Sequence, residues 1–368
     1  MIDISKSFQS VIANSDVNIS IGEGEILGLV GENGAGKTTL LNMLYGLSQP
    51  DSGTIQLNGK DISINSPGES RRHGIGMVHQ HFMLIPNHSV AENIALGYEM
   101  TPLLFPQRKI KDSIITYSKK FNFDIDPSRS VWQLSAGEQQ RVEIIKALIN
   151  GADLLILDEP TSVLTSQETR DLFQNLREMK TQGHLIILIS HKLDEILAIC
   201  DRVTVLQKGR IVGEAQTTDV DKKSLARMMI GRDIIFQIEK EPMERSDKVI
   251  TIDNVVVKND KDLEAVKGIS FDIYRNEIFG IAGVSGNGQR ELVEAITGLR
   301  PVESGKIAID KKDITNESVR CIYNSGIAHV PEERIKFGIA PGLCLYENAI
   351  LKQHHKPKYS NKLFLAYS

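Results

Sequence analysis

Short, nearly continuous apolar runs alternate with longer amphipathic stretches along the first two thirds of the chain. The runs 26–30, 154–157 and 185–189 consist of apolar or small residues, which is typical of strands buried on both faces of a parallel sheet. The stretches 135–149 and 166–180 place apolar residues at helical spacing. This alternation predicts an α/β fold with a mostly parallel sheet.

Two other patterns modify this plan. Residues 2–21 predict two short strands, and the segments 54–57 and 60–64 flank Asn58-Gly59, a pair favoured in tight hairpin turns. From 87 to 133 the chain is polar, helical in pattern and interrupted by prolines. We therefore expect a mixed sheet with an antiparallel portion and a separate helical subdomain.

The chain also contains an internal repeat. When the sequence is shifted so that Glu25-Ile26 falls on Glu277-Ile278, it matches itself over many short segments. Among the matching segments are Gly31, Gly34 and Gly36 with Gly283, Gly286 and Gly288, Gly46-Leu47 with Gly298-Leu299, and Ser52-Gly53 with Ser304-Gly305. We interpret this as a tandem duplication, with a first domain at 1–232, a charged linker at 233–248 and a second domain at 249–368.

The second copy lacks counterparts of the later features of the first. Segments found at 134–191 in the first copy would fall beyond residue 368 in the second. We therefore expect the second domain to be represented only by its N-terminal half, either because the sequence is a fragment or because the gene product is short.

Composition narrows the function classes. Lys and Arg number 43 against 47 Asp and Glu, which gives a net charge of -4 and argues against a nucleic-acid binder. The three cysteines, Cys200, Cys321 and Cys344, lack metal-ligand spacing, and we expect them to be reduced, as in a cytoplasmic protein. No apolar run is long enough to cross a bilayer, so a role at a membrane would require partner proteins.

A glycine-rich segment follows the apolar run 26–30 directly. It reads Gly31-Glu32-Asn33-Gly34-Ala35-Gly36-Lys37-Thr38, the pattern of a phosphate-binding loop between a strand and a helix, and we call residues 31–38 the phosphate loop. Its backbone N–H groups and the helix that follows form an anion site. We expect Lys37 to reach the β- and γ-phosphates of a nucleoside triphosphate, Thr38 to ligate Mg²⁺ and Thr39 to reach the α-phosphate.

Two further segments are candidates for chemistry. The run 154–157 ends in Asp158 and Glu159, which suit a Mg²⁺ ligand and a base that activates water. The segment 134–141, LSAGEQQR, begins a helix in which Ser135 and Glu138 have capping-box spacing. Without further context, that segment is only a well-capped helix.

Four motifs of the chain, in their order, resemble those of ABC transporter ATP-binding subunits. They are the phosphate loop, LSAGEQQR at 134–141, LLILDEP at 154–160 and ISHK at 189–192. Three further segments resemble a narrower group, the fused, two-domain ATPases of simple-sugar and nucleoside importers. These segments are GMVHQHFML around Gln80, GVSGNGQREL and HVPEER. The resemblance implies a duplicated P-loop NTPase fold of the ABC-ATPase type, with a mixed sheet, a helical subdomain and a truncated second copy. We call residues 134–141 the signature.

The resemblance also implies roles for individual residues. Phe8 would stack on adenine, although an aromatic side chain at a strand end is often only packing. Gln80 would contact Mg²⁺ and the attacking water and couple the site to a membrane subunit. Ser135 and Gly137 would cap the γ-phosphate of a nucleotide on an opposing domain, and His191 would contact the γ-phosphate. Asp158 would hold Mg²⁺, with Glu159 as general base.

As a whole, the resemblance implies an ATP hydrolase with ATP and Mg²⁺ as cofactors. The protein would lie on the cytoplasmic face of the plasma membrane as a peripheral subunit. Its partners would be transmembrane permease subunits and, through them, an extracytoplasmic solute-binding protein. The transported solute would be a nucleoside or a simple sugar, and the narrower motifs favour the nucleoside.

The second copy departs from this pattern. Gln289 and Arg290 replace the loop lysine and threonine, Glu332 corresponds to Gln80, and Asp260 corresponds to Phe8. We expect the loop at 283–290 not to support efficient catalysis. A further departure is Thr165, at a position where the family usually has an aspartate that helps the two sites to communicate.

Three functional hypotheses follow. In this family a phosphate loop faces the signature of another domain, so a complete site requires a second chain or a further C-terminal part. The leading hypothesis is a transport-coupled ATPase, and the alternative is a non-catalytic ATP-binding fragment of such a subunit. A duplicated ATPase acting on ribosomes or DNA would require two intact sites, which the sequence does not contain.

Overall fold

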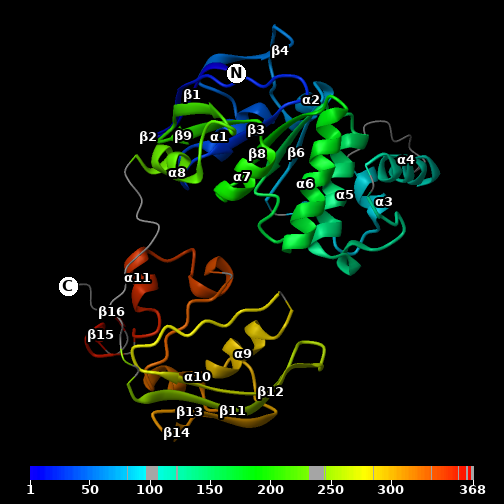
Figure 1. Ribbon diagram of the computed structural model, residues 1–368. Coiled ribbons are helices and arrows are strands. Elements are labelled where there is room, and N and C mark those ends of the chain that lie inside the picture. Colours follow the sequence, from blue (N-terminus) through cyan, green and yellow to red (C-terminus); the bar gives the residue numbers. More distant parts are fainter. Residues whose placement is uncertain are drawn as a thin grey trace. The chain divides into compact units, whose positions relative to one another are not determined.

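The computed structural model describes residues 1–80, 82–96, 107–121, 123–231, 244, 246–284, 286–332, 334–354, 356–361 and 364–365. The chain divides into two compact units, Met1–Ile238 and Glu239–Ser368, coloured blue to green and yellow-green to red in Figure 1. Most of the predicted linker at 233–248 lies outside the described residues.

The first unit is built on a six-stranded sheet of order β10-β9-β3-β8-β7-β6. Its strands are β3 (Ile26–Val30), β6 (Ile75–Val78), β7 (Leu154–Asp158), β8 (Leu185–Ile189), β9 (Arg202–Gln207) and β10 (Arg210–Gln216). All neighbouring pairs are parallel except β9 and β10. The strands predicted from the apolar runs are therefore confirmed, and β3 lies between β8 and β9.

A second, antiparallel sheet carries the early segments. Its order is β2-β1-β4-β5, with β1 (Ile2–Phe8), β2 (Val11–Val17), β4 (Ser52–Leu57) and β5 (Lys60–Ile62). The antiparallel portion was predicted as part of one mixed sheet, whereas the structure forms it as a separate sheet. The two short strands predicted within residues 2–21 are β1 and β2, and only Gln9 and Ser10 separate them.

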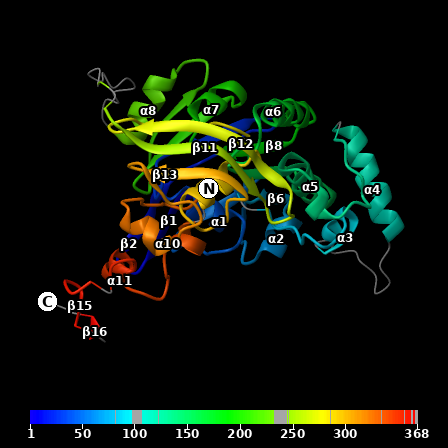
Figure 2. The same ribbon diagram turned by 90° about the horizontal axis from the view of Figure 1, so that it is seen from below.

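The helices of the first unit are α1 (Lys37–Leu44), α2 (Pro67–Arg72), α3 (Val90–Ala95), α4 (Gln107–Lys120), α5 (Ala136–Ile149), α6 (Ser166–Thr181), α7 (Leu193–Ile199) and α8 (Lys222–Ile230), with a short 3₁₀ turn at Val131–Gln133. Helices α3, α4 and α5 contact one another. Both views place α4 at the outer edge beside α3 (Figure 1 and Figure 2). This group is the predicted helical subdomain.

The two faces of the six-stranded sheet each bury one hydrophobic cluster. Alternate strand residues such as Ile26 and Leu155 pack on one face with α5 to α8, while Leu27 and Ile156 pack on the other with α1 and the antiparallel sheet. Full burial of such a side chain contributes about 1.5–3 kcal/mol. Burial on both faces explains why the strands read as continuous apolar runs.

The second unit repeats the antiparallel sheet, with order β12-β11-β13-β14. Its elements are β11 (Lys248–Lys258), β12 (Glu264–Tyr274), α9 (Gln289–Ile296), β13 (Ser304–Ile309), β14 (Lys312–Asp313), α10 (Val319–Asn324), a π turn at Arg334–Gly338, α11 (Leu345–Ile350), β15 (Ser360–Asn361) and β16 (Phe364–Leu365). Val255, Val257, Leu292 and Ile307 lie in its core.

One segment behaves differently in the two copies. Ile26 in β3 is fully buried, whereas its counterpart Ile278 is 86% exposed and lies outside any strand. In the first unit β8 and β9 hydrogen-bond to both edges of β3. No described strand of the second unit pairs with the segment 277–284 in this way, so its apolar side chains stay exposed. Among the described residues, no helix is long and apolar enough to cross a bilayer.

Candidate functional site

The phosphate loop connects the carboxyl end of β3 to α1, and two of its glycines allow close backbone contact. A Cβ atom on Gly31 would lie 2.2 Å from the carbonyl oxygen of Leu206, and one on Gly36 would lie 2.3 Å from that of Ala13. Gly36 also has a φ of 102°, which side-chain-bearing residues rarely adopt. The neighbouring strands therefore restrict both positions to glycine.

Lys37 is folded back over this loop. Its side chain is only 8% exposed, and Nζ donates hydrogen bonds of 2.7 Å to the Gly31 carbonyl and 3.0 Å to the Glu32 carbonyl. Burial lowers the pKa of the Lys37 ammonium, while the charges of Glu159 and Asp158 act in the opposite direction. The ammonium group is thus held against the backbone of the phosphate loop.

The other residues of the loop and of the first turn of α1 differ in exposure. Glu32, Asn33 and Gly34 are exposed and Ala35 is buried; Thr38 is exposed and Thr39 half-buried in the first turn of α1. Asn14 was not predicted from the sequence. It is fully buried on β2, and its side-chain nitrogen donates 3.3 Å to the carbonyl of Gly36.

Three predicted catalytic side chains meet at the carboxyl edge of the sheet. Oε2 of Glu159 accepts a 3.1 Å hydrogen bond from the amide of Gln80. Its other oxygen lies 2.9 Å from Nδ1 of His191. These residues follow β6, β7 and β8, whose parallel arrangement brings their ends together. Glu159 has a φ of 46°, an uncommon conformation that occurs at functional sites.

Asp158 lies at the end of β7 beside this cluster. Burial raises the pKa of its carboxyl, the neighbouring Glu159 adds to the rise, and Lys37 opposes it. Among the described residues, no group of three or more His, Cys, Asp or Glu side chains could hold a metal ion. The donor set of Asp158 and the Thr38 hydroxyl fits Mg²⁺, because this ion is commonly held by one or two protein oxygens together with substrate phosphates.

Glu195 is a second residue that sequence reasoning missed. Its carboxylate accepts hydrogen bonds from Thr161 Oγ1 (2.6 Å) and Ser190 Oγ (3.1 Å), and it pairs with Lys192 at 3.0 Å. These contacts tie the segment after β7 to the segment after β8, which carries His191. No local pattern indicates the contact with Thr161, because Thr161 and Glu195 are 34 residues apart in sequence.

The signature residues form a separate cluster. Ser135 caps α5 and completes the predicted capping box with Glu138. Ser135 Oγ and the backbone N–H of Gly137 both lie 3.3 Å from Oε1 of Glu168. Glu168 itself belongs to a capping box with Thr165 at the start of α6, a spacing that is readable in the sequence. The structure thus places Ser135 and Gly137 beside Glu168, and the described contacts do not join them to the phosphate loop.

Phe8 ends β1 and is 50% exposed. Lys6 Nζ lies 5.6 Å from the centre of its ring. Its β1–β2 hairpin carries Asn14, which contacts the phosphate loop. This position is compatible with both stacking on a base and simple packing.

The second loop retains its glycine conformations. Gly286 and Gly288 have φ values of 88° and 90°. Arg290, however, pairs with Glu294 at 2.8 Å along α9, and Arg300 bridges Glu294 and Asp260, each at 2.7 Å. The residues that replace the loop threonine and the aromatic of the first copy thus belong to one ion-pair network.

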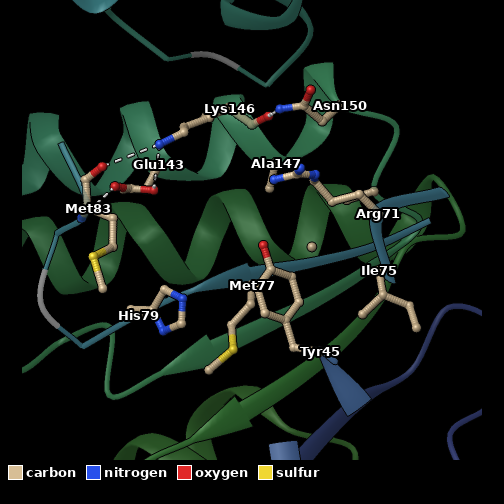
Figure 3. A pocket seen from close by; sticks show the side chains of 12 residues that line it. Tyr45, Arg71, Ile75, Met77, His79, Met83, Glu143, Lys146, Ala147 and Asn150 are labelled. Atoms are coloured by element: carbon tan, nitrogen blue, oxygen red, sulfur yellow. Dashed lines mark hydrogen bonds and ion pairs between the residues drawn. The ribbon is translucent and has the colours of Figure 1, made fainter. Parts of the chain in front are cut away.

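A surface cavity of about 130 Å³ lies between β6 and α5. Figure 3 shows Glu143 and Lys146 of α5 pointing toward Met83, while His79 and Tyr45 line the opposite side. The backbone N–H of Met83 donates 2.8 Å to Glu143, and Lys146 donates 3.4 Å to the Met83 carbonyl. The wall of the cavity is therefore linked to the segment that carries Gln80.

Comparison with known proteins identifies the family and relatives of this chain. The family described as ABC transporter matches residues 14–162 and 266–363. The chain is 43% identical over 369 residues to the nucleoside import ATP-binding protein NupA of Lactococcus lactis subsp. cremoris (strain MG1363), covering 100% of this chain and 73% of that protein. It is 42% identical over 400 residues to the glucose import ATP-binding protein TsgD13 of Haloferax volcanii, covering 100% of this chain and 72% of that protein.

A solved structure gives the same result for the fold. The ADP conformation of MJ1267, an ATP-binding cassette of an ABC transporter, aligns with a TM-score of 0.55 and 26% identity, over 62% of this chain and 97% of that one. The family and fold predicted from the motifs are therefore confirmed.

Proposed function

Because the chain belongs to the ABC transporter family, whose ATP-binding proteins are ATPases, we propose that its ATP hydrolysis energises the import of a nucleoside or simple sugar. The observation that carries the catalytic assignment is the contact of Glu159 with both Gln80 and His191, next to the Lys37 cation. A carboxylate held in this way beside a phosphate site suits a general base for water.

In the proposed mechanism, the N–H groups of the phosphate loop and the Lys37 ammonium bind and orient the phosphate chain. Asp158 and Thr38 would hold Mg²⁺ together with phosphate oxygens, and the ion would neutralise charge on the transferring phosphoryl group. Glu159 accepts a proton from the attacking water. Gln80 and His191 fix the direction of its carboxylate and face the γ-phosphate. Phe8 stacks on the base.

The remaining predicted phosphate contacts belong to the signature. Ser135 and Gly137 present a hydroxyl and a backbone N–H at the N-terminus of α5, which is a favourable place for an anion. We assign them to the γ-phosphate of a nucleotide bound to an opposing ATPase domain. This assignment makes hydrolysis dependent on pairing.

We assign the contact with the membrane permease to the cavity of Figure 3. It combines an exposed apolar side chain, Met83, with the charged Glu143 and Lys146, and its lining includes His79, the residue before Gln80. A partner seated there would move the residue that orients Glu159. The protein would work at the cytoplasmic side of the membrane, and a solute-binding protein would reach it only through the permease.

The second candidate function is ATP binding without hydrolysis by this chain alone. It is favoured by the second loop, in which Arg290 pairs with Glu294 and the loop lysine is replaced by Gln289. ATPase rate measured against protein concentration separates the two candidates. A quadratic rise indicates that first domains of two chains pair, and a flat baseline supports binding alone.

Glu159→Gln tests the catalytic assignment. The amide keeps the size of the side chain but cannot accept the proton, so we expect turnover to fall about 10²–10⁴-fold while the ATP dissociation constant stays within a few fold. Glu23→Gln, a neutralisation at an exposed position before β3, is the control and should leave both quantities unchanged. Near-normal turnover in Glu159→Gln would refute the assignment of the base.

A further inference from the structure

Glu168 occupies the donors that the proposed function assigns to the γ-phosphate. One oxygen, Oε1, lies 3.3 Å from Ser135 Oγ and 3.3 Å from the backbone nitrogen of Gly137. The other oxygen, Oε2, accepts hydrogen bonds of 2.9 and 3.0 Å from the N–H and hydroxyl of Thr165. A single carboxylate therefore bridges the start of α6 to the start of α5.

The carboxylate leaves no room for a side chain at position 137. A Cβ atom on Gly137 would lie only 2.4 Å from Oε1 and 2.7 Å from the carboxyl carbon of Glu168. The carboxylate also lies at the positive end of α5, a helix of 14 residues. The hydrogen bond from the Thr165 N–H is the main cause of the lowered pKa of Glu168, burial opposes it, and the bonds from Gly137 and Ser135 add to it. The group is therefore an anion at neutral pH.

A phosphate oxygen cannot share this position with a carboxylate. The Ser135 hydroxyl and the Gly137 N–H each have one hydrogen to donate, and both are directed at Oε1. A negative phosphate oxygen close enough to bind the same donors would also be repelled by the Glu168 carboxylate. Binding of a γ-phosphate at the signature therefore requires that Glu168 leave.

We propose that Glu168 is an internal competitor for the γ-phosphate: it holds the signature donors in the nucleotide-free chain and turns away when ATP on an opposing domain reaches them. The inference rests on the proposed function, because that function gives Ser135 and Gly137 their phosphate role. The inference adds Glu168 as a positioning residue that sets the ATP concentration needed to assemble a complete site.

A small cavity and a buried donor that has no partner among the described residues lie next to the Glu168 carboxylate. The cavity measures about 10 Å³, comparable to one water molecule. Its polar and charged lining residues are Gln140, Arg141, Glu168, Asp171 and Asn175. Gln140 is 2% exposed, and its side-chain nitrogen has no hydrogen-bond partner within the described part of the chain. Rotation of Glu168 toward this donor releases Ser135 and Gly137 and satisfies a buried amide.

A purely structural role for Glu168 makes a different prediction. As the third residue of α6, Glu168 completes a capping box with Thr165. Glu168→Gln removes the charge but retains a side chain that can complete a capping box. Thr165→Ala removes the side-chain cap together with one hydrogen bond to Oε2, but it retains the charge and the donors Ser135 and Gly137 on Oε1. The two variants therefore separate competition from helix capping.

The first test measures anion binding at the signature of the full chain and does not require pairing. In a Lys37→Met background, which removes the cation of the phosphate loop, thermal unfolding is followed against inorganic phosphate, with chloride at equal ionic strength as the reference. We expect phosphate to raise the unfolding temperature of Glu168→Ala, and this rise to vanish when Ser135→Ala is added. Absence of any phosphate-specific rise in Glu168→Ala would overturn the proposal.

The second test measures assembly. In a Glu159→Gln background, sedimentation velocity gives the ATP concentration at half-maximal self-association of the full chain. We expect Glu168→Gln to lower this concentration about tenfold, since one charge-assisted hydrogen bond corresponds to roughly that factor. Thr165→Ala should lower only the unfolding temperature, and an equal shift of the association midpoint in both variants would show that capping alone is at work.

The two tests also separate this inference from the proposed function. ATP binding to the phosphate loop, read from a fluorescent ATP analogue, should be the same in Glu168→Gln and in the unchanged chain. If phosphate binds Glu168→Ala through Ser135 but ATP drives no association, the competitor is supported and the pairing part of the proposed function fails. If ATP drives association with an unchanged midpoint in Glu168→Gln, the competitor is refuted and pairing stands.

Discussion

Two glycines of the phosphate loop allow a quantitative test of the geometry. Both Gly34 and Gly36 have positive φ, at 82° and 102°. A Cβ atom on Gly34 would meet nothing within 4 Å, whereas one on Gly36 would lie 2.3 Å from the Ala13 carbonyl and 2.8 Å from the side-chain nitrogen of Asn14. Both Gly34→Ala and Gly36→Ala therefore place alanine in a strained backbone conformation. Only Gly36→Ala also causes a steric clash.

The shared effect is the backbone conformation, which costs about 1–2 kcal/mol for a side-chain-bearing residue. Gly36→Ala adds overpacking against the β2 backbone, which costs about 1–3 kcal/mol. Its total of about 2–5 kcal/mol is a large part of the usual stability of a domain, about 5–15 kcal/mol. For a unit of this size, we expect Gly36→Ala to lower the unfolding temperature by about 5–15 °C.

The assay is thermal unfolding of the full chain. The single tryptophan, Trp132, lies in the first unit, so its fluorescence reports on that unit. The repeat supplies an independent pair: Gly286 has open space and Gly288 would meet the Ala265 carbonyl at 2.4 Å, and far-UV circular dichroism follows their alanine variants. Equal loss of stability in Gly34→Ala and Gly36→Ala would refute the close approach of β2 to the loop.

Two further predictions concern titratable groups. Burial raises the pKa of Asp158, so its protonated form is favoured in the folded chain, and its contribution to stability is lost as the pH rises from about 4 through the raised value. Thermal unfolding should therefore show Asp158→Asn to be more stable than the unchanged protein at pH 7, with a gain that shrinks toward about pH 4, and a gain independent of pH would contradict this. Burial raises the pKa of the Cys200 thiol, whereas Cys344 is exposed. A thiol reagent at about pH 8 should modify Cys344 and reach Cys200 only after unfolding, and mass spectrometry of the labelled peptides detects either result.

Much of the fold was readable because it depends on local pattern. The apolar runs that became β3, β7 and β8 predicted their strands to within a few residues, because burial on both faces leaves a continuous apolar signal. Ser135 and Glu138 predicted the beginning of α5, since a capping box involves residues three apart. The separation of the antiparallel strands into a second sheet was missed, because strand pairing is decided by contacts between distant segments.

The candidate site likewise has parts that local sequence patterns predict and parts that depend on contacts between distant segments. The phosphate loop, the acid pair and the signature were each recognisable in the sequence. The meeting of Glu159 with Gln80 and His191 depends on the order of β6, β7 and β8 in the sheet. Sequence placed these residues in one site only through resemblance to a family.

The sequence by itself determined the buried strands β3, β7 and β8, the beginning of α5, the glycine pattern of the phosphate loop, the repeat and the family. These features follow from short-range spacing, glycine geometry and residue chemistry. The tertiary structure alone decided that the carboxylate of Glu168 lies on the signature donors, and that Ile278 is exposed where its counterpart Ile26 is buried. The physical reason is that burial and hydrogen bonding depend on which distant segments pack together, and a local pattern is the same whether or not those neighbours are present.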